Sequence, residues 1–457
     1  MAILPEAPRG FWDDFAPIFT RPTCRRFLPL IGAAILTVGR RTVANLLRTA
    51  GPLAVGSASS YTRVFSRARW SPLRLAEPLT RRVVALLPPG AEVVLVADDT
   101  VFSHPGRRVF GKARHRDPVR SSHAFTAWRY GHKWVVLAVL VRLPYAARPW
   151  ALPVLVALYR DPADDRRERR RHRTPAQQAI RLVRLMLHWF PRRRFVFVGD
   201  SAYGAHELAR FADRNRERLT LVSKLHPEAN LFEPPPPYDG LGRPRVKGER
   251  LPKPRQAVEA TPRRRRTTVA WYGGGTRRVE TATGAGRWYK GGDGLVPIRW
   301  AFVHDRDGTH RDEYFYATDA SFDVRRIVEA YRGRWSIETT FQEARSELHV
   351  QTTRGWSEPT VLRAVPRLFG LYSVVAMLYA WLPKRRRAGG VSWPGKSVVT
   401  FSDALRPSAA GSRPRGFSHT SPTARPSRNF RLRSARSSTQ PSHRRHRGRG
   451  NCTSRAE

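Results

Sequence analysis

Apolar residues occur along the chain in two kinds of run, which predict two kinds of element. Residues 1–90 carry long runs, of which Leu28–Val38 and Pro72–Leu87 predict helices. Beyond residue 90 there are runs rich in β-branched residues, as in Glu92–Ala97 and Phe195–Val198. Such runs are typical of buried strands. We therefore expect a helical N-terminal region followed by a sheet.

The N-terminal pattern allows two interpretations. Gly39 separates the first apolar run from a short predicted helix at Thr42–Thr49, which ends at Gly51. A helix, a glycine-containing turn and a basic helix can form a helix-turn-helix that binds DNA. The same order also suits an ordinary helical bundle.

Helices alternate with strands in the next part of the chain. After a charged loop at Arg160–Arg173, Thr174 and Pro175 have the residue types of an N-cap and a first helical position, and they predict a helix to Trp189. A helix at His206–Arg216 and a strand at Leu219–Val222 follow. This order predicts an α/β fold built on a mixed sheet.

Residues 226–312 break this pattern with clusters of proline, glycine and arginine between short β-like pieces. We interpret them as an inserted, largely β, basic subdomain. The main pattern resumes with a strand at Glu313–Ala317. Ser321 is predicted to cap a long helix that runs towards Leu348, and a last apolar helix follows at Pro366–Leu382.

The composition changes again near the C-terminal end. From about Arg406 the chain is rich in serine, arginine, proline, glycine and histidine without periodicity, so we expect it to be disordered. A shifted reading frame in GC-rich DNA would give this composition, and we hypothesise that the natural C-terminus is lost or scrambled here. The chain thus divides into a helical N-terminal domain that could bind DNA ends (1–90), the first part of the core (91–225), a β-rich basic insertion (226–312), the second part of the core (313–385) and a basic low-complexity tail (386–457).

The charge balance indicates a polyanionic partner. The 457 residues include 83 lysines and arginines against 36 aspartates and glutamates, a net charge of +47. Each phosphate that such a surface neutralises releases a counterion, so nucleic acid is the expected class of partner. A GC-rich coding sequence would also enrich arginine, so charge alone does not define the function.

Cysteine usage and the length of the apolar runs exclude other classes of protein. The two cysteines, Cys24 and Cys452, lie at opposite ends, which excludes a disulfide framework and fits a reducing cytoplasm. Early acidic residues argue against a signal peptide. The longest apolar runs are shorter than the roughly 18–20 residues of a membrane span, so we expect no membrane partner.

Two predicted strands are each followed by carboxylates. Asp98 and Asp99 follow Val93–Ala97, and Asp200 follows Phe195–Gly199. If the two strands are neighbours, the sheet holds these acids close together. A single acid after a strand is usually a turn or cap residue, but two of them with a third acid on a helix form a less common set.

The third acid lies on the predicted helix that follows. At 100° per residue, Tyr331, Arg334, Glu338 and Arg345 share one narrow stripe, beside an apolar stripe that can pack on the sheet. The alternative is a solvated face on which Arg334 and Glu338 form an i,i+4 ion pair. Gly333 costs the helix about 1 kcal/mol, so a break there is also compatible with the pattern.

Three carboxylates without organising cysteines or histidines suit Mg²⁺ or Mn²⁺ rather than zinc. Two such ions about 4 Å apart can activate a water or a 3′-hydroxyl and stabilise the leaving oxygen of a phosphodiester. Arg334 and Arg345 would then hold phosphates. In the insertion, Arg243 and Arg245 either grip the DNA backbone or belong to a solvated loop.

Three motifs resemble those of the DDE transposases of bacterial insertion sequences. They are Asp98-Asp99-Thr100 after a strand, the run from Gly199 to Gly204 (Gly-Asp-Ser-Ala-Tyr-Gly) after another, and the helix Tyr-x2-Arg-x3-Glu-x6-basic that begins at Tyr331. The match is to the group with a Tyr/Arg/Glu/Lys signature helix, and it covers roughly residues 20–385. Arg345 stands where that group usually has lysine.

The resemblance implies an RNase H-like catalytic core, in which a mixed sheet is flanked by helices and a β-rich insertion precedes the last acid. It implies that Asp98, Asp200 and Glu338 are catalytic and bind two Mg²⁺ or Mn²⁺ ions. Asp99 is the alternative to Asp98, which the Asp-x-Thr pattern favours. Tyr331 and Arg334 would contact DNA near the cleavage point.

The implied function is cut-and-paste transposition in a bacterial cytoplasm, at the nucleoid. The implied partners are double-stranded DNA, both terminal inverted repeats and target, and a second copy of the chain that bridges two ends. Two alternatives stay open: an RNase H-like nuclease without strand transfer, and an inactive or domesticated DNA-binding relic of a transposase.

Overall fold

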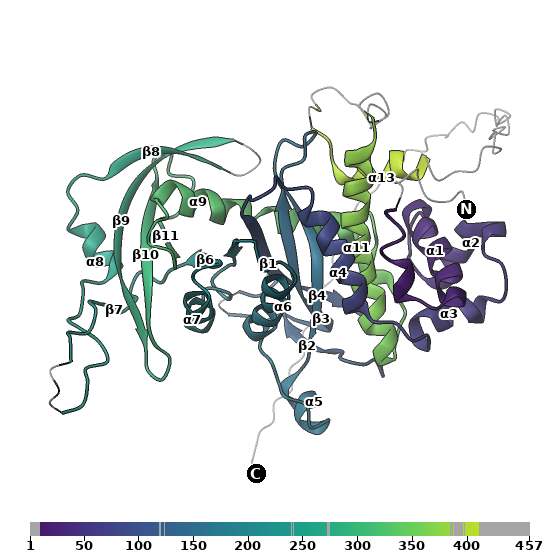
Figure 1. Cartoon of the computed structure of the whole chain (residues 1–457), viewed down its shortest axis with the longest axis horizontal. Helices are drawn as coiled ribbons and strands as arrows, with labels where there is room; N and C mark the ends of the chain where they lie inside the picture. The colour runs from purple at the N-terminus through teal and green to yellow at the C-terminus, as the bar shows by residue number, and fades with distance from the viewer. Residues whose placement is uncertain are drawn as a thin grey trace, which may run out of the picture. The chain divides into compact units, whose positions relative to one another are not determined.

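The computed structural model describes residues 10–117, 120–122, 124–238, 240, 242–271, 275–383, 387, 396 and 398–410; of residues 406–410 it describes the backbone. Figure 1 shows a large twisted sheet flanked by helices, with the N-terminal helices gathered at one end. The mixed α/β class and the N-terminal helices that we expected from the sequence are confirmed.

The N-terminal region consists of α1 (Arg21–Leu36), α2 (Val43–Ala50), α3 (Ala58–Ser66) and α4 (Pro72–Val84), with short 3₁₀ turns at Ala16–Ile18 and Gly51–Leu53. Thr42 caps α2 by accepting the Asn45 N–H, and Ser71 caps α4 in the same way. Helices α1, α2 and α3 pack against one another, and α4 packs on the sheet.

Within the described residues the sheet has eleven strands. They are β1 (Val93–Ser103), β2 (Ala113–Arg116), β3 (Trp128–Val141), β4 (Trp150–Tyr159), β5 (Phe195–Val198), β6 (Leu219–Lys224), β7 (Leu231–Phe232), β8 (Arg265–Ala270), β9 (Thr276–Lys290), β10 (Gly294–Asp305) and β11 (Glu313–Ala317). Their order is β2-β3-β1-β5-β6-β11-β10-β9-β7, with β4 also beside β3 and β8 also beside β9.

The sheet has two halves that differ in strand direction. In the core half, β3 is antiparallel to its neighbours β4 and β1, whereas β1, β5 and β6 run parallel to one another. In the insertion half, β11, β10, β9, β8 and β7 pair antiparallel. Residues 226–312 are therefore β-rich, as expected, but their strands continue the core sheet through the β11–β6 pair and do not form a separate one.

Strand β1 is longer than the sequence pattern predicts. We expected it to end at Ala97, before Asp98 and Asp99, but it pairs with β3 as far as Ser103, opposite Gly131. The parallel pairing with β5, in contrast, stops at Val96 and Val198. Asp98 therefore lies in the middle of a strand, beside the point where its parallel neighbour ends.

Helices α5 (Pro162–Arg167), α6 (Pro175–Trp189), α7 (His206–Arg214) and α8 (Pro254–Glu259) lie between the strands in sequence. Thr174 caps α6 as predicted, in a capping box with Gln177. The charged segment Arg160–Arg173, which we expected to be a loop, contains the short helix α5 because Asp161 accepts the Ala163 N–H at its start.

The single long helix predicted from Ser321 to Leu348 is wrong. The structure has two helices, α9 (Val324–Gly333) and α10 (Ser336–Ser346). Asp323, not Ser321, is the N-cap, because its carboxylate accepts the Arg326 N–H while the Ser321 hydroxyl donates to Asp319. The break follows Gly333, which is a poor helix former, and a 3₁₀ turn (Val350–Thr352) follows α10.

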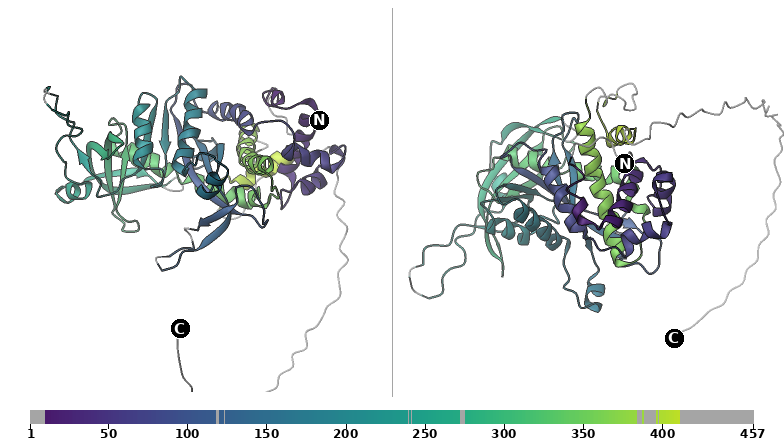
Figure 2. Two further views of the ribbon diagram at one scale, coloured as in Figure 1. Left: turned by 90° about the horizontal axis from the view of Figure 1, so that it is seen from below. Right: turned by 45° about the vertical axis from the view of Figure 1, so that its right-hand side comes forward.

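Helix α11 (Glu358–Trp381) is the one helix in the described part of the chain that is long and apolar enough to cross a membrane. Its most apolar stretch is 78% buried within the fold, where it packs on β4. Figures 1 and 2 show α11 between the N-terminal helices and the sheet, as a core helix would lie.

The described core extends beyond residue 385. Helix α13 (Phe401–Ala410) packs on α11, and the Phe401 ring stacks on Tyr372 with 4.1 Å between centroids. The tail predicted to begin at 386 thus includes a folded helix, whose Phe401 and Ala404 are buried against the rest of the fold. The remaining residues of the predicted tail, 386, 388–395, 397 and 411–457, lie outside the described residues.

Candidate active site

Strand register brings Asp98 and Asp200 together. Val96 on β1 pairs with Val198 on the parallel strand β5, and each aspartate comes two residues later. The Asp200 carboxylate is held by its own turn, because Oδ1 accepts the N–H groups of Ala202 (2.9 Å) and Tyr203 (3.3 Å). Two carboxylates thus lie side by side in the middle of the sheet.

The Gly-Asp-Ser-Ala-Tyr-Gly motif has a packing reason as well. A Cβ at Gly199 would lie 2.3 Å from Cβ of Tyr203, so only glycine lets the chain turn back on itself after β5. Tyr203 is consequently buried beneath the acids. Burial and the carboxylates of Asp99, Asp98 and Asp200 raise the pKa of the Tyr203 hydroxyl well above its usual value.

Asp98 carries an unfavourable charge. Its pKa is raised to about 7. Burial is the largest cause, Arg334 and the Asp99 N–H lower the pKa, and the Asp200 and Asp99 carboxylates raise it. The strongest favourable contact is the Arg334 guanidinium, whose Nη1 donates to Oδ2 of Asp98 at 3.0 Å.

Asp99 meets a different group. The Lys133 Nζ on β3 lies 3.0 Å from its Oδ2. Burial raises the pKa of Asp99, Lys133 lowers it, and Asp200 raises it. Of the two adjacent aspartates, it is Asp98 that the geometry joins to Arg334 and, through it, to Glu338.

Glu338 reaches the aspartates through Arg334. The other terminal nitrogen of this arginine, Nη2, donates to Glu338 Oε1 at 3.0 Å. The i,i+4 pair that we considered as a solvated alternative therefore exists, but the arginine is nearly buried, with 10% of its side chain exposed, and it bridges two acids. Glu338 is more open to solvent, at 35%.

The predicted Tyr–Arg–Glu–Arg stripe is only partly realised. The Arg345 guanidinium donates to the Thr100 hydroxyl and lies over the Phe102 ring. It therefore contacts the part of β1 that comes after Asp98. Tyr331, on the other side of the helix break, packs against Phe315 of β11 instead, with ring centroids 4.6 Å apart. Tyr331 stays close to the site through Arg334, which lies 5.6 Å from its ring.

The model of the DDE superfamily endonucleases matches residues 14–278, which is more than half of the chain. The chain belongs to this family. The match contains Asp98 and Asp200, and Glu338 lies beyond it.

Among solved structures, seven chains match this DDE family member. One is the piggyBac transposase in a synaptic complex with hairpin DNA, at 12% identity and a TM-score of 0.41, over 88% of this chain and 74% of that one. No curated protein sequence matches.

Within the described residues of this DDE family member, no three His, Cys, Asp or Glu side chains are grouped closely enough to hold a metal ion. The guanidinium of Arg334 lies between Asp98 and Glu338. The donor set itself fits a hard divalent cation, because it offers the carboxylate oxygens that Mg²⁺ and Mn²⁺ prefer.

The predicted DNA-contacting residues Arg243 and Arg245 are not near this site. They lie on the exposed loop between β7 and α8, which projects from the insertion half in Figure 1. Sequence reasoning also missed Lys133. The sequence feature that could have identified Lys133 is its position directly before the apolar run Trp134–Val141. A charged residue at the start of a buried strand suggests a buried partner of opposite charge.

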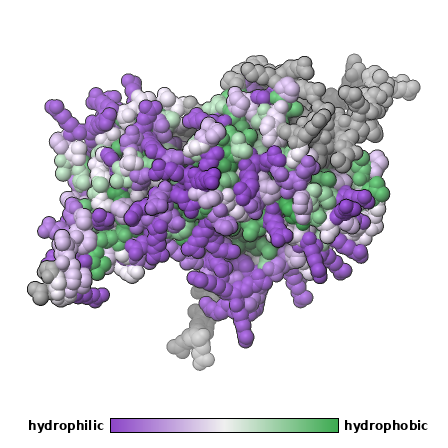
Figure 3. Space-filling view, in the orientation of Figure 1, coloured by the Kyte–Doolittle hydropathy of each residue, from purple (hydrophilic) through white to green (hydrophobic). Residues whose placement is uncertain are grey.

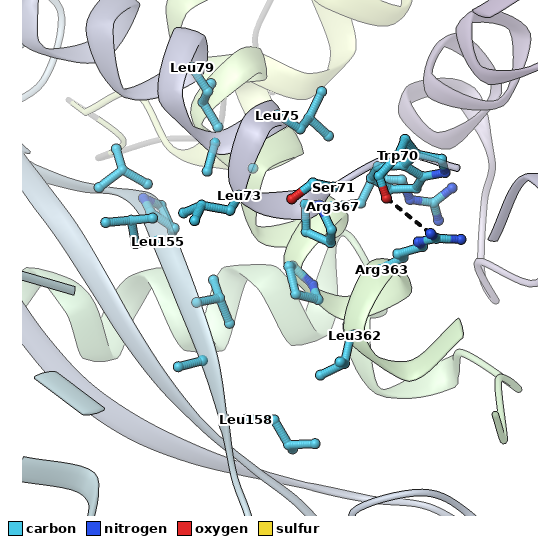
Figure 4. Close-up of a pocket in the computed structure, with 18 of the residues that line it drawn as sticks. Trp70, Ser71, Leu73, Leu75, Leu79, Leu155, Leu158, Leu362, Arg363 and Arg367 are labelled. Atoms are coloured by element: carbon cyan, nitrogen blue, oxygen red, sulfur yellow. Dashed lines mark hydrogen bonds between the residues drawn. The ribbon is translucent and has the colours of Figure 1, made fainter. Parts of the chain in front are cut away.

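This DDE family member also has a cavity away from the candidate acids, lined mostly by apolar residues. It has a volume of about 980 Å³ and lies between α4, α11 and β4, and Figure 4 shows leucines along its walls with Arg363 and Arg367 at one end. The dashed bond in that view is Arg363 donating to the Trp70 carbonyl. None of the three candidate acids lines this cavity.

Proposed function

We propose that this chain is a DNA transposase that cleaves the ends of a mobile element in a metal-dependent reaction and joins them to target DNA. The observation that carries the proposal is the placement of Asp98 and Asp200 on neighbouring parallel strands, with Glu338 joined to Asp98 through Arg334. Membership of the DDE superfamily endonucleases supports the cleavage chemistry.

The core half of the sheet supports the finer assignment of an RNase H-like core. Its order β4-β3-β1-β5-β6, with three antiparallel strands followed by two parallel to β1, is the order that such a core implies. The insertion falls between β6 and β11, before the helix that carries Glu338. This is the position that the sequence resemblance implies.

Asp98, Asp200 and Glu338 are the residues that would hold Mg²⁺ or Mn²⁺. When bound, two such ions activate a water or a 3′-hydroxyl and stabilise the leaving oxygen of the phosphodiester. The chain's own contribution is to fix Asp98 and Asp200 at the sheet and Glu338 on α10, and to supply Arg345 and Arg334 for phosphate oxygens.

The surface charge supports double-stranded DNA as the partner. The segment around α5 exposes Arg166, Arg169 and Arg171, and Figure 3 shows hydrophilic side chains crowded there. Such surfaces bind the phosphate backbone with an affinity that falls steeply with salt. We infer that a pair of chains, each holding one element end, works at the bacterial nucleoid.

The decisive experiment uses DNA fragments that carry the element's flanking ends, incubated with the full chain and Mg²⁺ or with EDTA. We expect nicks at the element boundary in Mg²⁺ only, and joined products when pre-cleaved ends are offered with a target plasmid. Cleavage without joined products would favour a nuclease without strand transfer. Binding without either reaction would favour a DNA-binding relic.

A further inference from the structure

Arg334 engages two of the carboxylates that the proposed metal site needs. Its Nη1 and Nη2 donate to Asp98 Oδ2 and Glu338 Oε1, both at 3.0 Å. We propose that Arg334 is an internal counter-ion that competes with the divalent metal until a DNA phosphate draws it away, so that metal and DNA bind cooperatively. This inference rests on the proposed function and adds to it a positioning residue and a binding order.

The competition follows from shared oxygens. A divalent magnesium ion needs carboxylate oxygens at about 2.0–2.1 Å in near-octahedral geometry. The guanidinium of Arg334 takes one oxygen from Asp98 and one from Glu338, and it lies between the two side chains. A metal ion and this guanidinium cannot both sit there, because two cations in contact with the same oxygens repel each other.

Arg334 is placed where a change of partner is easy. It lies between α9 and α10, where N–H groups bond three residues back: that of Arg334 to Tyr331, and that of Ile337 to Arg334. Its own Nε has no hydrogen-bond partner among the described atoms. Glu338, on the outer side, is one-third exposed, which leaves a route to solvent.

A phosphate is the ligand that would release it. Guanidinium and phosphate form two parallel charge-assisted hydrogen bonds, which a carboxylate pair held on separate elements cannot match in geometry. Arg345 of α10, which donates to the Thr100 hydroxyl of β1, adds positive charge for that phosphate. Once Arg334 turns to DNA, the Asp98 and Glu338 oxygens become free for the metal.

Linkage makes the effect reciprocal. If DNA raises the affinity for metal by some factor, metal raises the affinity for DNA by the same factor. The chain would therefore hold little metal when it is away from DNA, and would complete its active site only on a substrate.

The test measures Mn²⁺ binding directly, by electron paramagnetic resonance of free Mn²⁺ during titration of the full chain. Arg334→Gln removes the counter-ion. Arg325→Gln is the matched control, because Arg325 forms an i,i+4 pair with Glu329 on the outer face of α9 and its loss changes the net charge equally. Without DNA, we expect Arg334→Gln to bind Mn²⁺ about tenfold more tightly than wild type, with Arg325→Gln close to wild type.

Adding a DNA duplex that carries the element end completes the test. Wild type should gain about tenfold in Mn²⁺ affinity, and Arg334→Gln should gain almost nothing. Equal or weaker Mn²⁺ binding by Arg334→Gln, relative to Arg325→Gln, would overturn the inference. Arg334→Lys, whose single ammonium contacts one carboxylate at a time, serves as the second variant and should lie between wild type and Arg334→Gln.

Failure of the proposed function would look different. In that case, adding Asp98→Asn to Arg334→Gln would leave Mn²⁺ binding unchanged, because the ion would not be at this site. Loss of Mn²⁺ binding in the double variant, with no gain in the single one, would reject the counter-ion and keep the metal site.

Discussion

Asp98 and Asp99 in the core half of the sheet and Asp305 and Glu313 in the insertion half all have side chains less than one quarter exposed. Their pKa values nevertheless move in opposite directions: raised for Asp98 and Asp99, lowered for Asp305 and Glu313. Burial raises the pKa of both Asp98 and Asp99, and their partners do not compensate. For Asp305, burial is outweighed by its hydrogen bonds and by Arg277, so its pKa is lowered.

The difference lies in how completely each acid is satisfied. Asp305 accepts the N–H groups of Asp307, Thr309 and His310, and lies 2.8 Å from Arg277 Nε. Asp98 has one arginine and one N–H against two neighbouring carboxylates. Acids that cost stability where they stand are characteristic of functional sites, whereas a fully bonded acid serves the fold.

The largest expected effect is on catalysis. If the proposed function holds, Asp98→Asn, Asp200→Asn and Glu338→Gln should each lower Mg²⁺-dependent cleavage by roughly a thousandfold. Each would then remove a metal ligand, and with it several kcal/mol of transition-state stabilisation. Gel assays of end cleavage would measure this. Asp312→Asn, at an exposed ion pair of the insertion half, should cleave like wild type; an equal loss there would erase the contrast between the halves.

The next effect is on stability in the insertion half. Asp305→Ala should cost about 3 kcal/mol, because it breaks a buried ion pair and leaves three N–H groups unbonded. Urea denaturation would measure the change. Asp312→Ala, whose partner His304 is exposed, should cost less than about 1 kcal/mol. Similar costs for both would show that Asp305 is not the structural acid described above.

In the core half, replacing an acid is expected to raise stability instead of lowering it. The folded pKa of Asp98 is about 7, above the unfolded value near 3.9, so ionised Asp98 destabilises the fold and stability falls as the pH rises from about 4 to about 7. Asp98→Asn should therefore be more stable than wild type at pH 8 in EDTA, by on the order of 1–3 kcal/mol. The gap should close near pH 4, and a gap that is constant with pH would contradict the assignment.

The smallest effect concerns the exposed arginines. The double variant Arg243→Gln/Arg245→Gln should lower the slope of log affinity against log salt for duplex DNA by about one to two, because each phosphate contact adds about 0.9. Filter binding at several salt concentrations would measure it, with Arg325→Gln as the control. An unchanged slope would assign these residues to the solvated loop that the sequence also allowed.

The elements that could be predicted are those decided by the local sequence pattern. The strand Phe195–Val198, the strand Glu313–Ala317 and the Thr174 cap appear where the pattern places them. The continuation of β1 past Asp98 could not be predicted, because pairing with β3 determines it and the Asp-Asp-Thr sequence does not.

The site was predictable in its residue types more than in its contacts. The prediction at 100° per residue assumed one unbroken helix. Because the helix breaks after Gly333, Tyr331 packs towards β11 and Arg334 lies between two acids. Lys133 belongs to none of the three motifs. Its contact with Asp99 could not be predicted, because only the pairing of β3 with β1 brings the two residues together.

The continuity of the sheet has a consequence for synthesis on the ribosome. Strand β6 receives its outer neighbour from β11, which is translated only after the whole insertion, on the order of ten seconds later at ordinary rates. During that time Leu219–Lys224 presents an apolar strand with an open edge, which is a template for aggregation. We therefore expect a chain truncated within the insertion to aggregate through this open edge, in addition to lacking Glu338 of α10.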